Sequence, residues 1–156
     1  MSSTDAFRIA SRLGLLTTVL MFGLIVVGSV VRTTGSGLAC PDWPTCNGQW
    51  FPPLEGAVGL QMTHRWGGYL LTLVVLLAAA RARAADAPGV RRGATVAALL
   101  TMLQVALGVS NVLLGTPPWA SALHLANAAA LLATLVTTTY RAAAPAALPL
   151  RAAVAT

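Results

Sequence analysis

Two histidines are the residues of this sequence best suited to chemistry. His64 and His124 are its only histidines, and both lie in long apolar stretches. An ionisable side chain inside a membrane span is uncommon and marks a candidate functional site. Imidazole nitrogens ligate metals and transfer protons. The alternative is a structural role, in which each ring forms a hydrogen bond with a neighbouring helix.

Two cysteines form the second candidate. Cys40 and Cys46 are separated by five residues in a segment rich in Gly, Pro and Trp. If this segment faces an oxidising compartment, we expect a disulfide. It would be either a structural staple or an exposed redox pair that exchanges with thiols. Two cysteines without a nearby histidine do not supply the ligands of a zinc site.

The composition indicates that these residues lie in a membrane protein. Of 156 residues 56% are apolar and 9% are charged, and the mean hydropathy is +0.75. An ordinary soluble domain has about a quarter of its residues charged. Membrane lipid is therefore the expected surrounding. The net charge of +6 comes from arginines, and no basic-aromatic pattern or phosphate-binding loop indicates nucleic acid.

Four apolar segments are long enough to cross a bilayer, which needs about 20 residues. A Gly-Thr-Pro-Pro sequence at 115–118 divides the long uncharged region 93–140 into two spans. The first segment is longer than the apolar part of a typical signal peptide, so we interpret it as an uncleaved span. The predicted spans are residues 13–31, 56–80, 93–114 and 119–140.

Arginines predict the orientation of these spans. Eight arginines flank one side (the N-terminal segment 1–12, the linker 81–92 and the tail 141–156), and two flank the other. Basic residues gather on the cytoplasmic side. We therefore expect an up-down-up-down four-helix bundle in the cytoplasmic membrane, with both termini cytoplasmic. Residues 32–55, with both cysteines, form an outer loop, and the Ala/Pro-rich tail is expected to be disordered.

This topology places the two histidines at similar depth. His64 lies about eight residues, and His124 about six, inside the outer end of its span. In such a bundle the second and fourth spans are diagonal neighbours. Adjacent axes are about 8–10 Å apart, so the diagonal is roughly 11–14 Å. That gap suits two imidazoles with the iron of a flat haem between them.

Arg32 and Arg65 are the only arginines on the outer side. A guanidinium matches a carboxylate in geometry, so either could hold a haem propionate. The alternative is a side chain that extends to the membrane surface. Small residues after each histidine either leave room for a macrocycle or allow close helix packing. Polar residues within the third and fourth spans could face the site or join helices: Gln104, Asn111 and Asn127.

The two halves of the chain also show a weak internal repeat. Gly28 and Gly35 flank the end of the first span, and Gly108 and Gly115 flank the end of the third at the same spacing. Duplication and chance both remain open explanations.

Taken together, these motifs resemble the haem A synthase family. The resemblance extends over about residues 15–140. The matching positions are Gly28 to Leu38, Cys40 to Pro44, Cys46, Gly48, His64-Arg65, Leu103-Gln104, Leu107-Gly108, Leu123-His124 and Asn127-Ala128. Members of that family usually have eight spans in two four-helix halves, each half with a haem site between paired histidines. This chain is similar to the cysteine-bearing catalytic half.

The resemblance implies an oxidoreductase that oxidises a methyl group of haem O to the formyl group of haem A during cytochrome oxidase assembly. His64 and His124 would ligate iron, and Cys40 and Cys46 would shape or reduce the site. Gln61 occupies the position where the family commonly has a catalytic glutamate, and a glutamine cannot ionise. The implied partners are haem O, a haem O synthase or electron donor, and a second half-size subunit or copy.

Two other functions remain open from the sequence. One is a bis-histidine haem carrier or b-type electron-transfer protein without oxidation chemistry, which Gln61 favours. The other is a haem-free assembly factor that acts through the outer loop.

Overall fold

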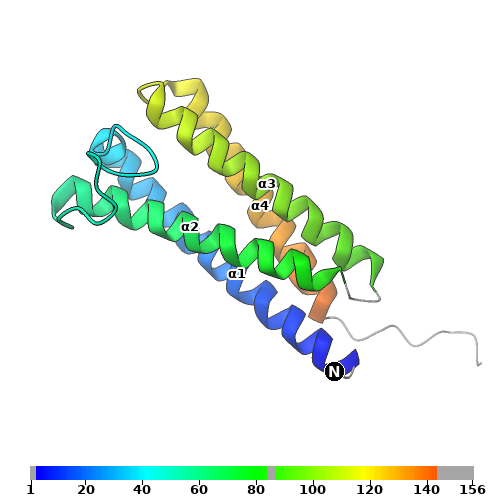
Figure 1. The fold of residues 1–156 in the computed structure, drawn as a ribbon. Helices are drawn as coiled ribbons and strands as arrows, with labels where there is room; N and C mark the ends of the chain where they lie inside the picture. The colour runs from blue at the N-terminus through cyan, green and yellow to red at the C-terminus, as the bar shows by residue number, and fades with distance from the viewer. Residues whose placement is uncertain (1–2, 84–86, 144–156) are drawn as a thin grey trace, which may run out of the picture.

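The computed structural model describes residues 3–83 and 87–143 and forms an antiparallel bundle of long helices (Figure 1). The elements are α1 (Ser3–Thr33), a short 3₁₀ helix η1 (Ser36–Leu38), α2 (Gly56–Ala82), α3 (Pro88–Leu113) and α4 (Pro118–Ala143). Within those ranges there is no strand, only an isolated bridge between Cys46 and Gln49. The predicted all-α four-helix fold is confirmed. Residues 144–156 of the predicted tail lie outside the described residues.

The helices extend beyond several predicted spans. α1 begins at Ser3 because no proline or glycine interrupts the chain before Gly14. α3 begins at Pro88, and α4 at Pro118. Proline suits the first turn of a helix, since its missing N–H has no partner there. Gly35 and Gly115 end the two helices that lead to the loop end, with φ values of 69° and 74° that favour glycine.

Packing between the helices follows the predicted order. α1 packs against α2 and α4, and α3 packs against the same two helices. α2 and α4 therefore lie on a diagonal, as the sequence predicted. The central core takes residues from all four helices: Met21, Leu71, Val75, Ala97, Ala128, Leu131 and Leu135.

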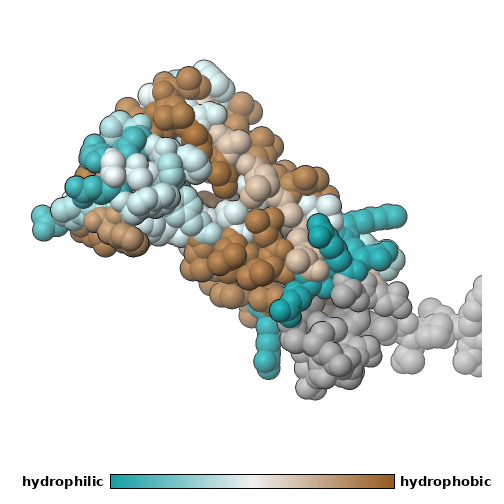
Figure 2. All heavy atoms as spheres, in the orientation of Figure 1, coloured by the Kyte–Doolittle hydropathy of each residue, from teal (hydrophilic) through white to brown (hydrophobic). Residues whose placement is uncertain are grey.

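The outward faces of the helices are apolar. Large side chains such as Phe22, Leu15 and Leu99 are 60–65% exposed, and Figure 2 shows apolar side chains along the middle of the visible face with hydrophilic residues toward its ends. All four helices are long and apolar enough to cross a membrane. A bilayer removes this surface from water. The protein is thus a multi-pass membrane protein; the side on which each terminus lies stays a prediction.

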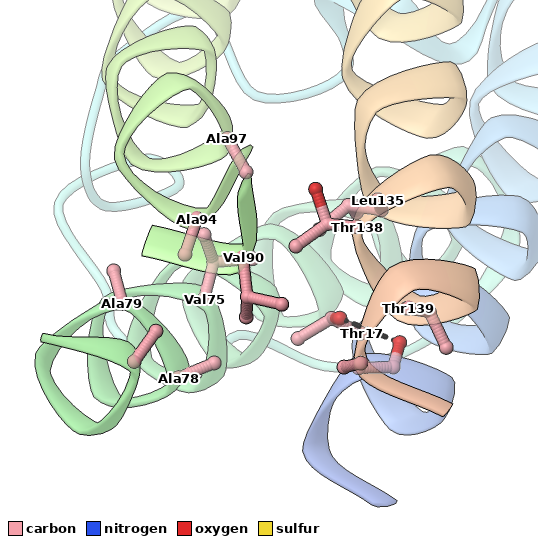
Figure 3. Close-up of a pocket in the computed structure, with 13 residues that line it drawn as sticks. Thr17, Val75, Ala78, Ala79, Val90, Ala94, Ala97, Leu135, Thr138 and Thr139 are labelled. Carbon is pink, nitrogen blue, oxygen red and sulfur yellow. Dashed lines mark hydrogen bonds between the residues drawn. The ribbon is translucent and has the colours of Figure 1, made fainter. Parts of the chain in front are cut away.

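The two helix hairpins, α1–α2 and α3–α4, separate toward the outer loop (Figure 1). At the opposite end all four helices converge around a cavity of about 40 Å³, which Figure 3 shows lined by short side chains. Its lining includes Thr17, Ala79, Ala94 and Thr138. Cofactor sites are roughly 300–1,000 Å³. This cavity is therefore too small for a large cofactor, and it lies far along the helices from the histidines.

Candidate functional site

Each histidine packs against a glycine on the preceding helix of its own hairpin. A Cβ added at Gly28 would lie 2.8 Å from Cε1 of His64, and one added at Gly108 would lie 3.1 Å from Cε1 of His124. Real Cβ atoms hardly ever come within 3.0 Å of a heavy atom of another, non-neighbouring residue, and a contact of 3.0–3.4 Å is tighter than nine in ten. The two glycines therefore provide space for the rings. This shared arrangement agrees with the internal repeat in the sequence.

Both imidazoles carry a buried nitrogen without a partner. In the described part of the chain, Nδ1 of His64 and Nδ1 of His124 lack any hydrogen bond. Buried polar atoms are nearly always paired, because an unpaired one costs about 1–3 kcal/mol. Two orphaned ring nitrogens at matching positions therefore indicate a site prepared for a further group.

The bundle is hollowed between the hairpins on the outer-loop side of its central core (Figure 2). The central core follows His64 by seven residues on α2 and His124 by four on α4. On α1 and α3 the core residues precede Gly28 by seven residues and Gly108 by eleven. The core thus lies on the side of the rings away from the outer loop. Figure 2 shows the molecule hollowed between the two hairpins toward that loop.

The two glycines after His64 have different roles. A Cβ at Gly67 would lie 2.9 Å from Cδ1 of Leu24, so this glycine allows α1 and α2 to pack closely. A Cβ at Gly68 would meet nothing within 4 Å. Both alternatives from the sequence therefore apply, one to each residue. The residues fit a flat group seated between the hairpins: two ring ligands, a hollow between the hairpins and an open position one turn from His64.

Polar residues of α3 and α4 join these two helices beside His124. Asn127 donates from Nδ2 to the carbonyl of Leu100 (3.0 Å) and to Oε1 of Gln104 (2.6 Å). Nε2 of Gln104 lies 3.1 Å from the backbone oxygen of His124 and 3.2 Å from its Nε2. Nearer the turn, Ser121 donates to Oδ1 of Asn111 (3.0 Å). Gln104 is the polar residue that contacts a histidine.

Cys40 and Cys46 form the predicted disulfide. Both cysteines are 0% exposed, and they pack with Met62, Val58 and Trp66 of α2. Of the two roles that the sequence left open, the structure supports the structural staple, because neither cysteine is exposed. The outer loop folds back onto α2, which the spacing of the cysteines alone could not indicate. A thiol must displace the loop before it reaches either sulfur.

Arg65 anchors this loop instead of extending toward solvent. The residue is 6% exposed. Its guanidinium donates to the carbonyls of Cys40 (2.5 Å), Asp42 (2.7 Å) and Thr45. Tyr69, one turn further along α2, donates to the carbonyl of Pro44 (2.8 Å). Both terminal nitrogens of Arg65 are thus bound to the loop, an arrangement that does not support the propionate role predicted for it. Arg32 is exposed in the last turn of α1.

Asp42 organises the turn that contains the cystine. Its carboxylate accepts from the Thr45 hydroxyl (2.5 Å) and from the backbone N–H groups of Asn47 (2.6 Å) and Gly48 (3.0 Å). The Thr45 hydrogen bond, followed by the Gly48 N–H, holds the pKa of Asp42 well below its ordinary value of 3.8. At pH values above 3.8 the carboxylate of Asp42 is therefore ionised as long as the turn is folded.

Gln61 lies one turn before His64, where its side chain connects α2 to η1. The residue is 4% exposed, and Nε2 donates to the carbonyl of Gly37 (3.2 Å). Its Oε1 is buried and has no partner among the residues described. The amide is neutral, so it offers an acceptor where a carboxylate would offer a charge.

Sequence reasoning missed the roles of Tyr69 and Asp42. Tyr69 follows Arg65 by four residues, and positions i and i+4 share a helix face. That spacing could have grouped the two residues. Asp42 is followed three residues later by Thr45, which is typical of a side-chain-stabilised turn.

The fold defines a class: a multi-pass membrane protein of two helix hairpins that each seat one histidine against a glycine. The chain belongs to the haem A synthase family, since the family model described as "COX15-CtaA: Cytochrome oxidase assembly protein" matches residues 11–59 and 50–136. The predicted resemblance is confirmed.

Individual relatives agree with this membership. "Heme A synthase" of Symbiobacterium thermophilum is 41% identical over 86 residues, which are 54% of this chain and 28% of that protein. "Heme A synthase" of Halalkalibacterium halodurans is 34% identical over 116 residues, 73% of this chain and 39% of that protein. "Protoheme IX farnesyltransferase" of Halobacterium salinarum is 33% identical over 118 residues, 74% of this chain and 26% of that protein. The chain thus spans well under half the length of these curated relatives.

Proposed function

We propose that this chain binds one haem between its two hairpins and that His64 and His124 would hold the iron. The observation that carries this proposal is their shared seating: each ring packs on a glycine of the preceding helix, on the side of the central core that leads to the outer loop. Haem iron accepts two histidines, and the protein tunes it through burial and neighbouring hydrogen bonds. When bound, the haem supplies the redox centre, and the chain supplies its position and surroundings.

The same proposal extends to the reaction. We infer that the bound haem would be haem O and that the chain would serve the oxidation of one of its methyl groups to the formyl group of haem A, a step that takes an oxygen atom from water and passes four electrons and four protons to an oxidant outside the chain. Relatives named "Heme A synthase" support this. Arg32, exposed at the end of α1, is the candidate partner of a propionate. We place the protein in the cytoplasmic membrane, with the outer loop outside.

Co-expression with a source of haem O tests the reaction. Haem extracted from the purified protein is identified by chromatography and mass. We expect hydroxylated or formylated haem from the wild-type chain and none from the double variant His64→Ala/His124→Ala. Bound haem that stays unmodified would contradict the enzyme proposal while leaving the haem site intact.

A second function, a haem carrier or b-type electron-transfer protein, is favoured by one observation. Gln61 presents a neutral amide one turn from His64, fixed by the Gly37 carbonyl, where oxidation chemistry would use a carboxylate. Gln61→Glu separates the two functions. A gain of oxidised haem would indicate an enzyme that has lost its catalytic carboxylate or takes one from a partner subunit. No gain would favour the carrier. Gln49→Glu, in the exposed part of the loop, controls for added charge.

Partners are proposed on the same grounds. We propose a second copy or another half-size subunit as a partner, as the resemblance to a family with two four-helix halves implies. The match to a relative named "Protoheme IX farnesyltransferase" supports a haem O synthase as the neighbouring enzyme. Mass measurement of the complex in native detergent tests the first proposal, and co-purification with a tagged haem O synthase tests the second.

A further inference from the structure

The two hairpins differ at one pair of matching positions. Gln104 precedes Gly108 by four residues and Asn127 follows His124 by three. In the other hairpin, Leu24 precedes Gly28 by four residues and Gly67 follows His64 by three. Leu24 and Gly67 are also in contact, since a Cβ at Gly67 would lie 2.9 Å from Leu24 Cδ1. A hydrogen-bonded pair beside one histidine thus replaces an apolar pair beside the other.

The hydrogen bonds beside His124 have only one consistent direction. The carbonyl of Leu100 can only accept, so the side-chain atom of Asn127 that lies 3.0 Å from it must be the amide nitrogen. That nitrogen also donates to Gln104, which identifies the accepting atom of Gln104 as Oε1. The other atom of the Gln104 amide is then the nitrogen, which donates to the backbone oxygen of His124.

This direction assigns the protonation of the ring. Nε2 of Gln104 has hydrogens and no lone pair to accept with, so Nε2 of His124, 3.2 Å away, must be the acceptor. A neutral imidazole that accepts at Nε2 carries its proton on Nδ1. His64 has no hydrogen bond to either ring nitrogen within the described ranges. Its tautomer is therefore not set by a neighbouring side chain.

We propose that Gln104 and Asn127 are positioning residues that hold His124 as the Nδ1–H tautomer in the haem-free protein, and that the Gln104 N–H occupies the Nε2 lone pair that iron takes when haem binds. The two histidines are then inequivalent: His124 is held by a hydrogen-bonded network, and His64 is held by packing alone. The ligation part rests on the proposed haem site. The tautomer part does not, because every group in the argument belongs to the chain. Iron can bind Nε2 only after this hydrogen bond from Gln104 breaks, since an unprotonated imidazole nitrogen has one lone pair.

Nitrogen NMR of the haem-free protein tests the tautomer directly. Histidine labelled with ¹⁵N gives distinct signals for the protonated and unprotonated ring nitrogens, and His64→Ala assigns the remaining ring. We expect His124 as a single Nδ1–H tautomer in the wild-type chain and a mixture of tautomers in Gln104→Leu. An Nε2–H tautomer in the wild type, or identical spectra for the two proteins, would overturn the proposal.

Titration of the haem-free protein with haem tests the consequence for ligation. We expect the dissociation constant of haem to fall about 2- to 10-fold in Gln104→Leu, because iron then displaces no hydrogen bond from Nε2, and to fall less in Asn127→Ala, which removes only the group that orients Gln104. Leu103→Ala, at a 47% exposed neighbour on the same helix, is the matched control and should bind like the wild type.

The outcomes separate the two proposals. If wild type and Gln104→Leu bind haem equally well, the positioning role is wrong although the haem site stands. If the wild type binds no haem while the Nδ1–H tautomer is found, the ligating role is wrong and the network remains as assigned.

Discussion

Hairpins α1–α2 and α3–α4 seat their histidines alike but support them differently. In the first, Leu24 and Gly67 pack together one turn from His64, and the helices are joined by a long loop that Arg65 holds to α2 and whose buried disulfide packs against α2. In the second, a short turn joins the helices, and Gln104 and Asn127 form hydrogen bonds beside the ring. The two hairpins thus share a backbone arrangement. The outer loop stabilises the hairpin of His64, and hydrogen bonds between the helices stabilise the hairpin of His124.

The first prediction concerns the loop, and it has the largest expected effect. Arg65→Met removes the donors to three loop carbonyls. An unpaired buried carbonyl costs about 1–3 kcal/mol, so we expect a loss on the order of 3 kcal/mol or more. Thermal unfolding in detergent measures the loss, and reduction of the Cys40–Cys46 disulfide by added thiol should become faster.

Arg32→Met is the matched control, because Arg32 is an exposed arginine at the same end of the bundle. It should leave both readouts near those of the wild type. Equal behaviour of the two variants would mean that Arg65 does not anchor the loop.

The second prediction concerns the glycines that seat the rings. Gly28→Ala places a methyl group 2.8 Å from the His64 ring, and Gly108→Ala places one 3.1 Å from the His124 ring. Overpacking costs about 1–3 kcal/mol, and the closer contact should cost more. We expect both variants to lose stability and haem affinity, Gly28→Ala to the greater extent.

Gly23→Ala separates this effect from helix propensity. Gly23 lies on α1, and a Cβ there would meet nothing within 4 Å. Alanine in a helix is about 0.5–1 kcal/mol more favourable than glycine, so this control should be slightly stabilised. A stabilised Gly28→Ala would contradict the close contact with His64.

The third prediction concerns pH at the loop, where we expect the smallest effect. Hydrogen bonds from Thr45, Gly48 and Asn47 lower the pKa of Asp42 below 3.8. A lowered pKa means that the ionised carboxylate stabilises the turn at pH values above its pKa in the unfolded chain. This contribution is lost as the pH falls through its pKa in the folded protein. Amide signals of Asn47 and Gly48 should therefore stay constant down to about pH 3.8 and shift only below it. Asp42→Asn should abolish that transition, and a transition centred above pH 3.8 in the wild type would contradict the assigned hydrogen bonds.

The sequence predicted the four helices and their diagonal order because span length, arginine bias and the Gly-Thr-Pro-Pro break act locally. It also indicated His64 and His124, since an intramembrane histidine stands out in any apolar segment. It could not predict that Arg65 turns back to the loop, because that depends on where the carbonyls of Cys40 and Thr45 fold. Nor could it predict the Gln104–Asn127 pair, which requires the rotation of α3 against α4.

An absorption spectrum of the purified protein tests the central claim most directly. The wild-type chain supplied with haem should give the spectrum of a six-coordinate, low-spin haem in both oxidation states. His64→Ala and His124→Ala should each lose that spectrum, because one axial ligand is removed. A wild-type protein that stays colourless in the presence of haem, or a six-coordinate spectrum that survives both substitutions, would contradict the haem site between the two hairpins.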